Sequence, residues 1–380
     1  MTIPFWFVLF WECAKKLPEF YNGVMLIEGI LAAVPTPFYS DERIYFRKLE
    51  ANVARYSRSL LSGLVMLGST GEAVALDDAE SRDVLRVAAE AAAPEKVLIA
   101  GVGRESVKAT VELAEVAAQF LYDAVLVRTP TYYATQLSTA AVLHYFRSVA
   151  DRSPLPVLLY NIPRCVPYNI PIEVIAELAQ HPNIVGIKDS SGSLSRIIAT
   201  LEATRHVARR TVTVTSIFEA VTVRMMAAKS EPDGTFVSAG ALASGGSGGT
   251  AVATASPAVP LKKTRSKQVG FQVLTGSHSI LVETLDAGAS GGILGVAAFA
   301  PQACQEVYLA WKDHDRALAV AKQNRIDWPG QRIAAQLNVS ALKYACDFNG
   351  YYGGSARAPL LPVTAEQKAE IEELLAGIRN

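Results

Sequence analysis

Cysteine and histidine are scarce in this chain of 380 residues. The four cysteines lie far apart with no CxxC pair, and the five histidines form no HExxH pattern. Such spacing indicates neither a disulfide framework nor a zinc site. We therefore expect no metal in the protein.

An excess of charge of either sign is also absent. The chain has 36 basic and 36 acidic side chains, and 50% of its residues are hydrophobic. This balance argues against nucleic acid or an anionic membrane surface as the main partner. The composition is that of a globular enzyme with one large domain and some additions. We expect a cytoplasmic protein, with mitochondria as the alternative.

The apolar run at the amino terminus is too short to cross a membrane. Pro4–Trp11 is almost wholly apolar, but about ten residues cannot span a bilayer, which needs roughly twenty. A basic segment and a small-residue cleavage site, the marks of a signal peptide, are both missing. We expect residues 1–26 to lie outside the fold, with Met25 near the true beginning of the protein.

Short apolar runs that end in polar or glycine residues recur along the chain, mostly separated by amphipathic helical stretches. Eight βα units of roughly 30 residues favour a (β/α)8 TIM barrel over a doubly wound open sheet. We expect an α/β protein with this barrel over residues 27–300 and a C-terminal helical region over 301–380. The eight runs are Ile30–Phe38, Gly63–Thr70, Val97–Gly103, Ala124–Pro130, Val157–Pro163, Ile184–Asp189, Phe271–Ser277 and Gly291–Val296.

One interval between the expected strands is much longer than the others. The runs that begin at Ile184 and Phe271 start 87 residues apart. Within this interval, Ser238–Pro260 consists mainly of small residues and carries no charge, which is typical of a flexible surface loop. We expect a low-complexity insertion at about 207–270, although an error in the gene model would leave the same pattern.

Lys188 stands near the end of an expected strand that carries Ile184, Val185 and Ile187. A strand of this kind is buried on both faces in a parallel sheet covered by helices. Burial disfavours an ammonium ion, and a neutral amine in a dry pocket is a nucleophile toward carbonyl groups. The alternative is a lysine at a strand end that extends its amine to solvent.

Polar residues end several other expected strands, and in a barrel such residues meet at one face. The turn Gly68–Glu72 has the sequence GSTGE, and successive backbone N–H groups in such a turn suit a carboxylate or phosphate. An ordinary βα turn is the alternative. Tyr160 ends the strand before that of Lys188. The two side chains can therefore converge, and a tyrosine beside a nucleophilic lysine can transfer protons.

The last two expected strands are rich in glycine near their ends, at Thr275–His278 and Gly288–Ile293. Glycines allow the backbone to approach a ligand, and this corner of a barrel often binds phosphate. A phosphosugar enzyme therefore has to be considered. Against that function, no glycine pair opens a helix here with a basic residue after it.

The motifs GSTGE, YNIP and GIKDSSG, in this order, resemble the dihydrodipicolinate synthase/N-acetylneuraminate lyase family of class I aldolases over residues 27–206 and 271–380. The resemblance implies that Lys188 forms a Schiff base and that Tyr160, with Ser69, transfers protons. The expected substrate-binding residues are Thr70, Gly71, Gly291, Gly292 and Ile293, together with Tyr132 or Tyr133, which in some members reaches into a partner subunit's site.

Finer similarity points to one branch of this family. The sequences QHPNIVG, FQVL and GYYGG look like those of 4-hydroxy-2-oxoglutarate aldolases. Synthases that make the lysine precursor usually carry an arginine five residues after the tyrosine, whereas this position is Cys165 and Arg164 lies one place earlier. The resemblance implies a homotetramer or homodimer that needs no cofactor and yields pyruvate and glyoxylate. Dihydrodipicolinate synthesis is the alternative, and a non-catalytic ligand-binding barrel is the alternative of another class.

Overall fold

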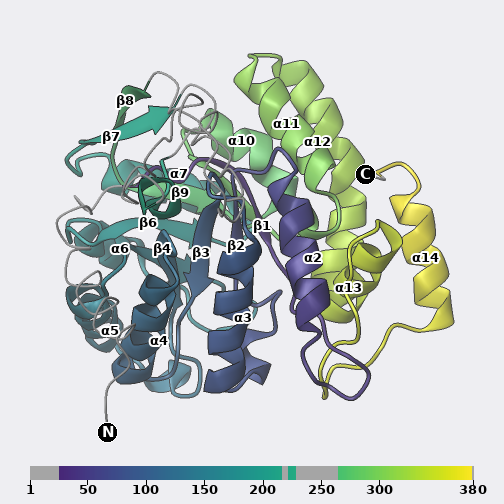
Figure 1. The fold of residues 1–380 in the computed structure, drawn as a ribbon. Coiled ribbons are helices and arrows are strands. Elements are labelled where there is room, and N and C mark those ends of the chain that lie inside the picture. Colours follow the sequence, from purple (N-terminus) through teal and green to yellow (C-terminus); the bar gives the residue numbers. More distant parts are fainter. Residues whose placement is uncertain (1–24, 216–220, 228–263, 379–380) are drawn as a thin grey trace, which may run out of the picture.

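The computed structural model describes residues 25–215, 221–227 and 264–378, and within them eight parallel strands close into a barrel (Figure 1). The (β/α)8 prediction is confirmed, because each of the eight expected runs supplies one strand. In barrel order the strands are β1 (Gly29–Ala33), β2 (Gly63–Met66), β3 (Val97–Gly101), β4 (Ala124–Arg128), β5 (Val157–Asn161), β6 (Ile184–Asp189), β9 (Gln272–Thr275) and β10 (Gly291–Leu294).

Helices follow the barrel strands and cover the outside of the barrel. Several begin at a residue whose side chain accepts a hydrogen bond from the first turn, such as Ser106, Ser138 and Ser193, which stabilises the helix start. The helices are α2 (Phe46–Ser57), α3 (Asp78–Ala91), α4 (Val107–Gln119), α5 (Thr139–Arg152), α6 (Ile172–Leu178), α7 (Leu194–Thr204), α10 (Leu281–Asp286) and α11 (Pro301–Lys312).

The strands are apolar on both faces because each face is buried. Leu31, Val65 and Ile99 point into the barrel and form one cluster. Their neighbours Ile30 and Leu64 point outward and pack in a second cluster beneath the helices. This arrangement explains the continuous apolar runs, which are typical of parallel sheets.

The segment between α7 and β9 lies at the amino-terminal ends of the barrel strands. There β7 (Arg210–Thr215) pairs antiparallel with β8 (Thr264–Val269), and a short helix, α8 (Val223–Ala227), follows β7. The Val223 N–H donates to Asp123 Oδ1 at 2.8 Å, and Asp123 immediately precedes β4. These elements therefore stand away from the carboxyl-terminal ends of the strands.

The edges of the expected segments differ in detail from the structure. The expected insertion at 207–270 contributes β7, α8 and β8, while the stretch Ser238–Pro260 lies outside the described residues. Residues 1–24 also lie outside them. Met25 belongs to the fold, because it is 5% exposed and its carbonyl accepts a 2.8 Å hydrogen bond from Gln272.

The C-terminal helices pack together beside the barrel (Figure 1). Helix α11 packs against β1 and so closes the ring of barrel helices. The remaining helical elements are α12 (Arg316–Gly330), the π-helical turn η5 (Gln331–Gln336), α13 (Asn338–Phe348) and α14 (Ala365–Leu375). Thr364 and Gln367 form a capping box at the start of α14. The part of the chain outside the barrel therefore begins near α12, later than the expected boundary at 301.

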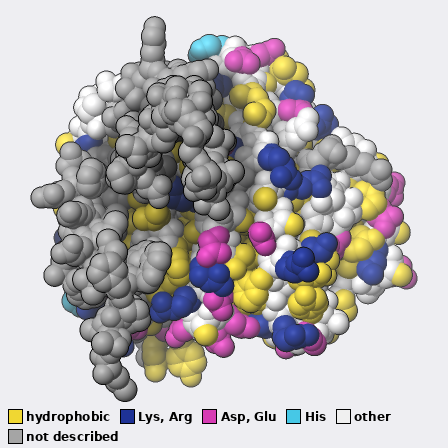
Figure 2. Space-filling view, in the orientation of Figure 1, with side chains coloured by type: hydrophobic (Ala, Val, Ile, Leu, Met, Phe, Trp, Pro, Cys, Tyr) yellow, Lys and Arg dark blue, Asp and Glu magenta, His cyan; other side chains and the backbone are white. Residues whose placement is uncertain are grey.

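The described surface is mixed in charge. In Figure 2, basic and acidic side chains both occur among hydrophobic and other groups over the part of this face that is not grey. Within the described ranges, no helix is long and apolar enough to cross a membrane.

Candidate active site

Lys188 and Tyr160 meet at the carboxyl-terminal ends of adjacent strands. They are register partners on β6 and β5, and Lys188 Nζ donates to Tyr160 Oη at 3.2 Å. The same nitrogen also lies 4.3 Å from the centre of the tyrosine ring. The two residues are only 4% and 5% exposed, so the alternative of a lysine extended to solvent is wrong.

Ser69 completes a row of three polar groups. Its Oγ lies 3.3 Å from Tyr160 Oη, in the turn that follows β2. Ser69 is exposed whereas Tyr160 and Lys188 are buried. The row therefore runs from the surface to the buried amine, and hydroxyl groups in such a row can transfer protons to and from a reacting group.

The turn that carries Ser69 has two backbone N–H groups free to bind a ligand. Its carbonyls are used internally, because Gly68 O accepts from Gly71 N and Ser69 O accepts from Glu72 N. Among the described residues, the N–H groups of Ser69 and Thr70 donate to no protein acceptor. Adjacent unpaired N–H groups form an anion-binding concavity, and here it lies beside the Tyr160 hydroxyl.

Thr70 and Gly71 differ in what they contact. A Cβ atom placed on Gly295, just after β10, would lie 3.7 Å from Thr70 Oγ1. Thr70 therefore faces the carboxyl-terminal end of β10. The carbonyl of Gly71 accepts a 2.7 Å hydrogen bond from Thr36 Oγ1, which fixes the turn against the segment that follows β1.

The three expected binding residues on β10 are buried. A Cβ atom on Gly291 would lie 2.0 Å from the carbonyl oxygen of Gly29, and one on Gly292 would meet Leu281 and Leu294 at 3.3 Å and 3.1 Å. Close packing therefore accounts for both glycines. Ile293 differs, because its fully buried side chain lies in the same interior cluster as Tyr160.

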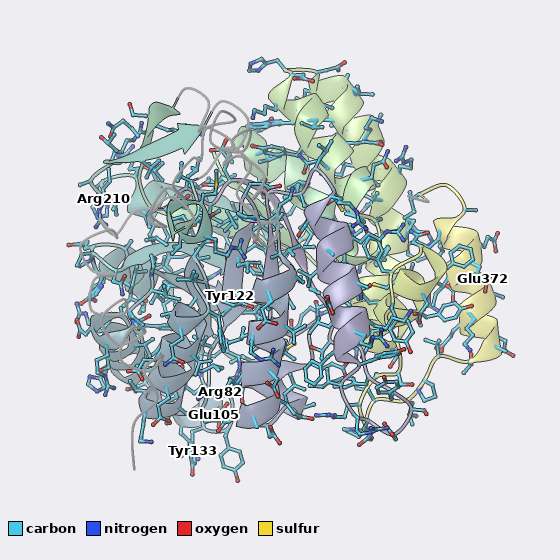
Figure 3. The ribbon with its side chains drawn as sticks, in the orientation of Figure 1. Arg82, Glu105, Tyr122, Tyr133, Arg210 and Glu372 are labelled. Carbon is cyan, nitrogen blue, oxygen red and sulfur yellow. The ribbon has the colours of Figure 1, made fainter. Side chains whose placement is uncertain are left out.

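Tyr132 and Tyr133 do not join the row of polar groups within this chain. They are 80% and 58% exposed, and Figure 3 shows Tyr133 projecting from the body of the protein beside Glu105. The Glu105 carboxylate accepts hydrogen bonds from the N–H groups of Thr131 and Tyr132 at 2.8 Å and 2.9 Å. The loop is thus held in place while both rings face outward.

Sequence reasoning missed the support behind the two strand ends. Asn161 and Asp189 follow Tyr160 and Lys188 and are also register partners. Asn161 donates to Asp189 at 3.1 Å, and Arg196 donates to the same carboxylate at 2.8 Å. In the sequence, these two polar residues directly follow Tyr160 and Lys188, and this position could have marked them as supporting residues. These contacts fix the spacing between β5 and β6.

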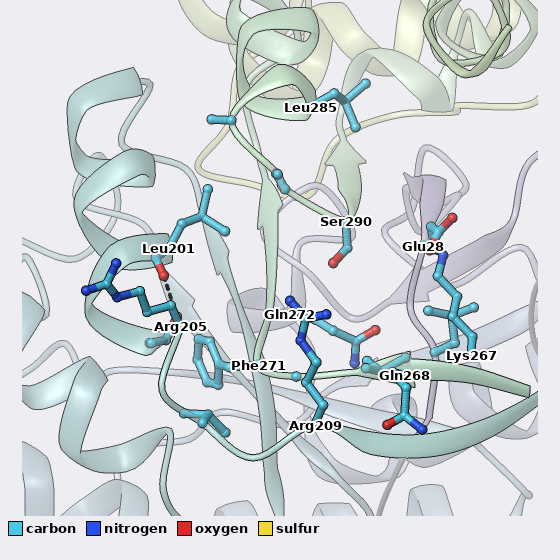
Figure 4. A pocket seen from close by; sticks show the side chains of 18 of the residues that line it. Glu28, Leu201, Arg205, Arg209, Lys267, Gln268, Phe271, Gln272, Leu285 and Ser290 are labelled. Atoms are coloured by element: carbon cyan, nitrogen blue, oxygen red, sulfur yellow. Dashed lines mark hydrogen bonds and ion pairs between the residues drawn. The ribbon is translucent and has the colours of Figure 1, made fainter. Parts of the chain in front are cut away.

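A cavity of about 700 Å³ lies at the opposite end of the barrel. Glu28, Gln272 and Ser290 line it (Figure 4), and each lies at or just before the start of a barrel strand. It is therefore separate from the site at Lys188. Within the described ranges, no group of three or more His, Cys, Asp or Glu residues could hold a metal ion.

Comparisons with known proteins agree with this architecture. The model of the Dihydrodipicolinate synthetase family matches residues 26–227 and 251–378. A 4-hydroxy-tetrahydrodipicolinate synthase from Acidiphilium cryptum is 27% identical over 93% of this chain and 99% of its own length. A probable mitochondrial 4-hydroxy-2-oxoglutarate aldolase from Emericella nidulans is 28% identical over 92% of this chain and 94% of that protein.

Solved structures show the same fold. YagE, a prophage protein of the dihydrodipicolinic acid synthase family from E. coli K12, in complex with pyruvate, has a TM-score of 0.71 and 24% identity, covering 93% of this chain and 99% of YagE. The sequence motifs predicted a resemblance over residues 27–206 and 271–380. The family model matches more of the chain between these two ranges, because its first match continues to residue 227 and its second begins at residue 251. The chain belongs to the dihydrodipicolinate synthetase family and is a class I aldolase or lyase.

Proposed function

We propose that this protein cleaves 4-hydroxy-2-oxoglutarate to pyruvate and glyoxylate through a Schiff base on Lys188. The observation that carries the proposal is the 3.2 Å contact between the buried Lys188 Nζ and Tyr160 Oη. A buried amine beside a hydroxyl group can form an imine with a ketone, because the hydroxyl can supply and remove the protons that this requires.

The reaction begins with binding of the C1 carboxylate at the N–H groups of Ser69 and Thr70. Lys188 Nζ attacks C2 of the substrate, and the C2 hydroxyl leaves as water with a proton from Tyr160. The protonated imine that results accepts electrons from C3. Ser69 Oγ, 3.3 Å from Tyr160 Oη, connects the tyrosine to solvent for proton exchange.

Cleavage uses the tyrosinate left by this first step. Tyr160 takes the proton of the C4 hydroxyl while the C3–C4 bond breaks and its electron pair enters the imine. Glyoxylate leaves and a neutral enamine remains on Lys188. The enamine takes a proton at C3 from Tyr160, and water hydrolyses the imine to release pyruvate.

Cleavage is supported over the condensation of pyruvate with aspartate semialdehyde because the synthases usually carry their arginine one place later than Arg164. The Arg164 guanidinium donates to the carbonyl of Ala335 in η5, while the next position is Cys165. An arginine is suited to a carboxylate because its fork binds two oxygens, but 4-hydroxy-2-oxoglutarate and aspartate semialdehyde both offer a carboxylate besides that of pyruvate, so this contact alone does not separate the two reactions.

We further propose a homodimer or homotetramer in which Tyr132 and Tyr133 contact a partner subunit. Both rings are exposed, and they contact each other edge to face with centroids 4.9 Å apart. Large exposed aromatic groups are enriched at protein interfaces. One similar structure is described as a monomeric dihydrodipicolinate synthase variant, so the molecular mass in solution has to be measured.

Rates with both substrates test the proposed reaction. The purified protein should release pyruvate from 4-hydroxy-2-oxoglutarate faster than it condenses pyruvate with aspartate semialdehyde. A clear preference for the semialdehyde would favour the synthase. Binding of pyruvate without turnover of either substrate would favour a ligand-binding barrel.

A further inference from the structure

The turn with Ser69 and Thr70 ends at a residue that faces away from the candidate active site. Glu72 has φ = 54°, in the left-handed region that residues other than glycine seldom adopt. Its side chain is 3% exposed and points toward the C-terminal helices. A conformation of this kind persists only where the surroundings hold it in place.

Both carboxylate oxygens of Glu72 have partners from the C-terminal region. Oε1 accepts from Lys343 Nζ at 2.6 Å, and Oε2 accepts from the Arg357 N–H at 2.8 Å. Lys343 lies on α13 and is fully buried. Its Nζ also donates to the carbonyl of Ser355 at 2.5 Å and lies 4.3 Å from the ring centre of Phe38.

Helix α13 also lies near Gly295, the residue that Thr70 faces. A Cβ atom on Gly295 would lie 3.6 Å from Leu342 Cδ1 and 3.7 Å from Thr70 Oγ1. Leu342 precedes Lys343 on α13. The helix therefore contacts the turn segment Thr70–Glu72 through the ion pair at Glu72, and its Leu342 lies near Gly295, the residue that Thr70 also faces.

A buried ion pair adds little stability compared with apolar side chains of similar size, because both ions lose their hydration. The role of the ion pair between Glu72 and Lys343 is to hold the backbone of the turn in position. It fixes the end of a short turn whose other residues carry the Ser69 hydroxyl and the two free N–H groups. A displacement of about 1 Å in such groups can lower turnover by roughly 100-fold.

We propose that Lys343 is a positioning residue for the reaction, acting through Glu72 on Ser69 and Thr70. This inference rests on the proposed Schiff-base function. The C-terminal helices thereby contribute to catalysis. Without the ion pair, the protein still folds and forms the imine on Lys188. Proton transfer to and from the imine becomes slower, and the substrate carboxylate is bound more weakly.

The test uses a double variant, Glu72→Gln with Lys343→Met, which removes both charges and retains similar side-chain volumes. No buried charge is left without a partner, so a folded protein is expected. Its matched control is Glu306→Gln with Lys322→Met, because that pair joins α11 and α12 at 2.8 Å and does not contact the turn.

Three measurements are compared with the unmodified protein. Trapping of pyruvate on Lys188 with borohydride at saturating pyruvate should be retained in the double variant. The kcat for cleavage of 4-hydroxy-2-oxoglutarate should fall roughly 10-fold to 100-fold, and the KM should rise. Exchange of the pyruvate methyl protons with deuterated solvent should slow similarly. The control variant should match the unmodified protein in all three.

Normal kcat and normal proton exchange in a folded double variant would overturn the positioning role. Should the double variant fail to fold, Glu72→Asp decides the question, because it retains the charge pair and shortens the side chain by one methylene group. A kcat unchanged by Glu72→Asp would also overturn the role. Failure of the unmodified protein to trap pyruvate would instead contradict the Schiff-base function itself.

Discussion

Tyr160 and Lys188 are 28 residues apart in sequence, yet their side chains meet because β5 and β6 align them in register. The hydroxyl and the amine both lie in the barrel, away from solvent. Neither strand alone provides this arrangement. The pairing of the strands determines which two side chains can react with one substrate.

Removal of the Tyr160 hydroxyl should slow the reaction far more than it destabilises the protein. We expect Tyr160→Phe to lower kcat by roughly 10²-fold to 10⁴-fold, the usual contribution of general acid–base catalysis. The control is Tyr122→Phe, since Tyr122 is fully buried and its hydroxyl donates to Leu85 O at 3.0 Å, away from the site. That variant should lose about 1 kcal/mol of stability and retain turnover. Equal turnover in both variants would leave Tyr160 with a packing role only.

The residue after Arg164 should affect the choice of substrate. We expect Cys165→Arg to raise the rate of condensation with aspartate semialdehyde relative to the rate of cleavage. The reason is that Cys165→Arg places an arginine where the synthases usually carry one, whereas the Arg164 guanidinium donates to Ala335. Arg164→Ala should leave the ratio of the two rates unchanged. The measurement is kcat/KM for condensation divided by kcat/KM for cleavage. A fall in this ratio after Arg164→Ala would show that Arg164 binds substrate.

Shortening the segment between β7 and β8 should preserve the chemistry at Lys188. Thr215 and Thr264 form the last pair of this hairpin, so Asn-Gly in place of residues 216–263 would close it with a two-residue turn. The replacement removes the donors that Val223 and Arg224 supply to Asp123 and to the carbonyl of Lys96, and we expect a less stable protein because each lost donor of this kind costs about 1–3 kcal/mol. Urea unfolding and borohydride trapping provide the two measurements. A folded protein that no longer traps pyruvate would show that the segment takes part in the site.

Asp123 should make the stability of the protein depend on pH. Burial raises the pKa of this fully buried carboxyl to about 6, against the attraction of Arg224. The native state then holds the proton more tightly than the unfolded chain, so the stabilising contribution is complete below pH 4 and is lost as pH rises through 6. Relative to Asp123→Asn, the unmodified protein should therefore become less stable between pH 4 and 6 in urea unfolding. A rise over this range would show that the attraction of Arg224 outweighs the effect of burial.

Much of the barrel is predictable from short-range patterns, because each strand is an apolar run that ends in polar or glycine residues. The C-terminal helices are less predictable from such patterns. The stretch Gln302–Gln323 resembles one amphipathic helix but is divided into α11 and α12, because His314 adopts φ = 63° without a glycine to mark the turn. The strand β7 has the alternating sequence RTVTVT, which is typical of a strand. It nevertheless falls within the expected insertion at 207–270, because most of that interval has low complexity.

The same distinction holds within the candidate site. Lys188, Tyr160 and Ser69 each end a recognisable strand, so the barrel rule brings them to one face. The contact between Glu72 and Lys343 joins residues 271 apart in sequence, one in a turn and one in a helix. A lysine on an amphipathic helix is normally expected on its exposed face, and only the packing of α13 against the turn reveals this contact.

Covalent trapping of pyruvate tests the central claim most directly. Borohydride reduction in the presence of pyruvate should add a stable mass to the peptide that contains Lys188, and Lys188→Ala should abolish it. Lys96 is an internal control: it is also buried, but its Nζ donates to the carbonyls of Ser59 and Leu61, so it should remain unlabelled. An unlabelled Lys188, or equal labelling of the protein after Lys188→Ala, would contradict the Schiff-base account.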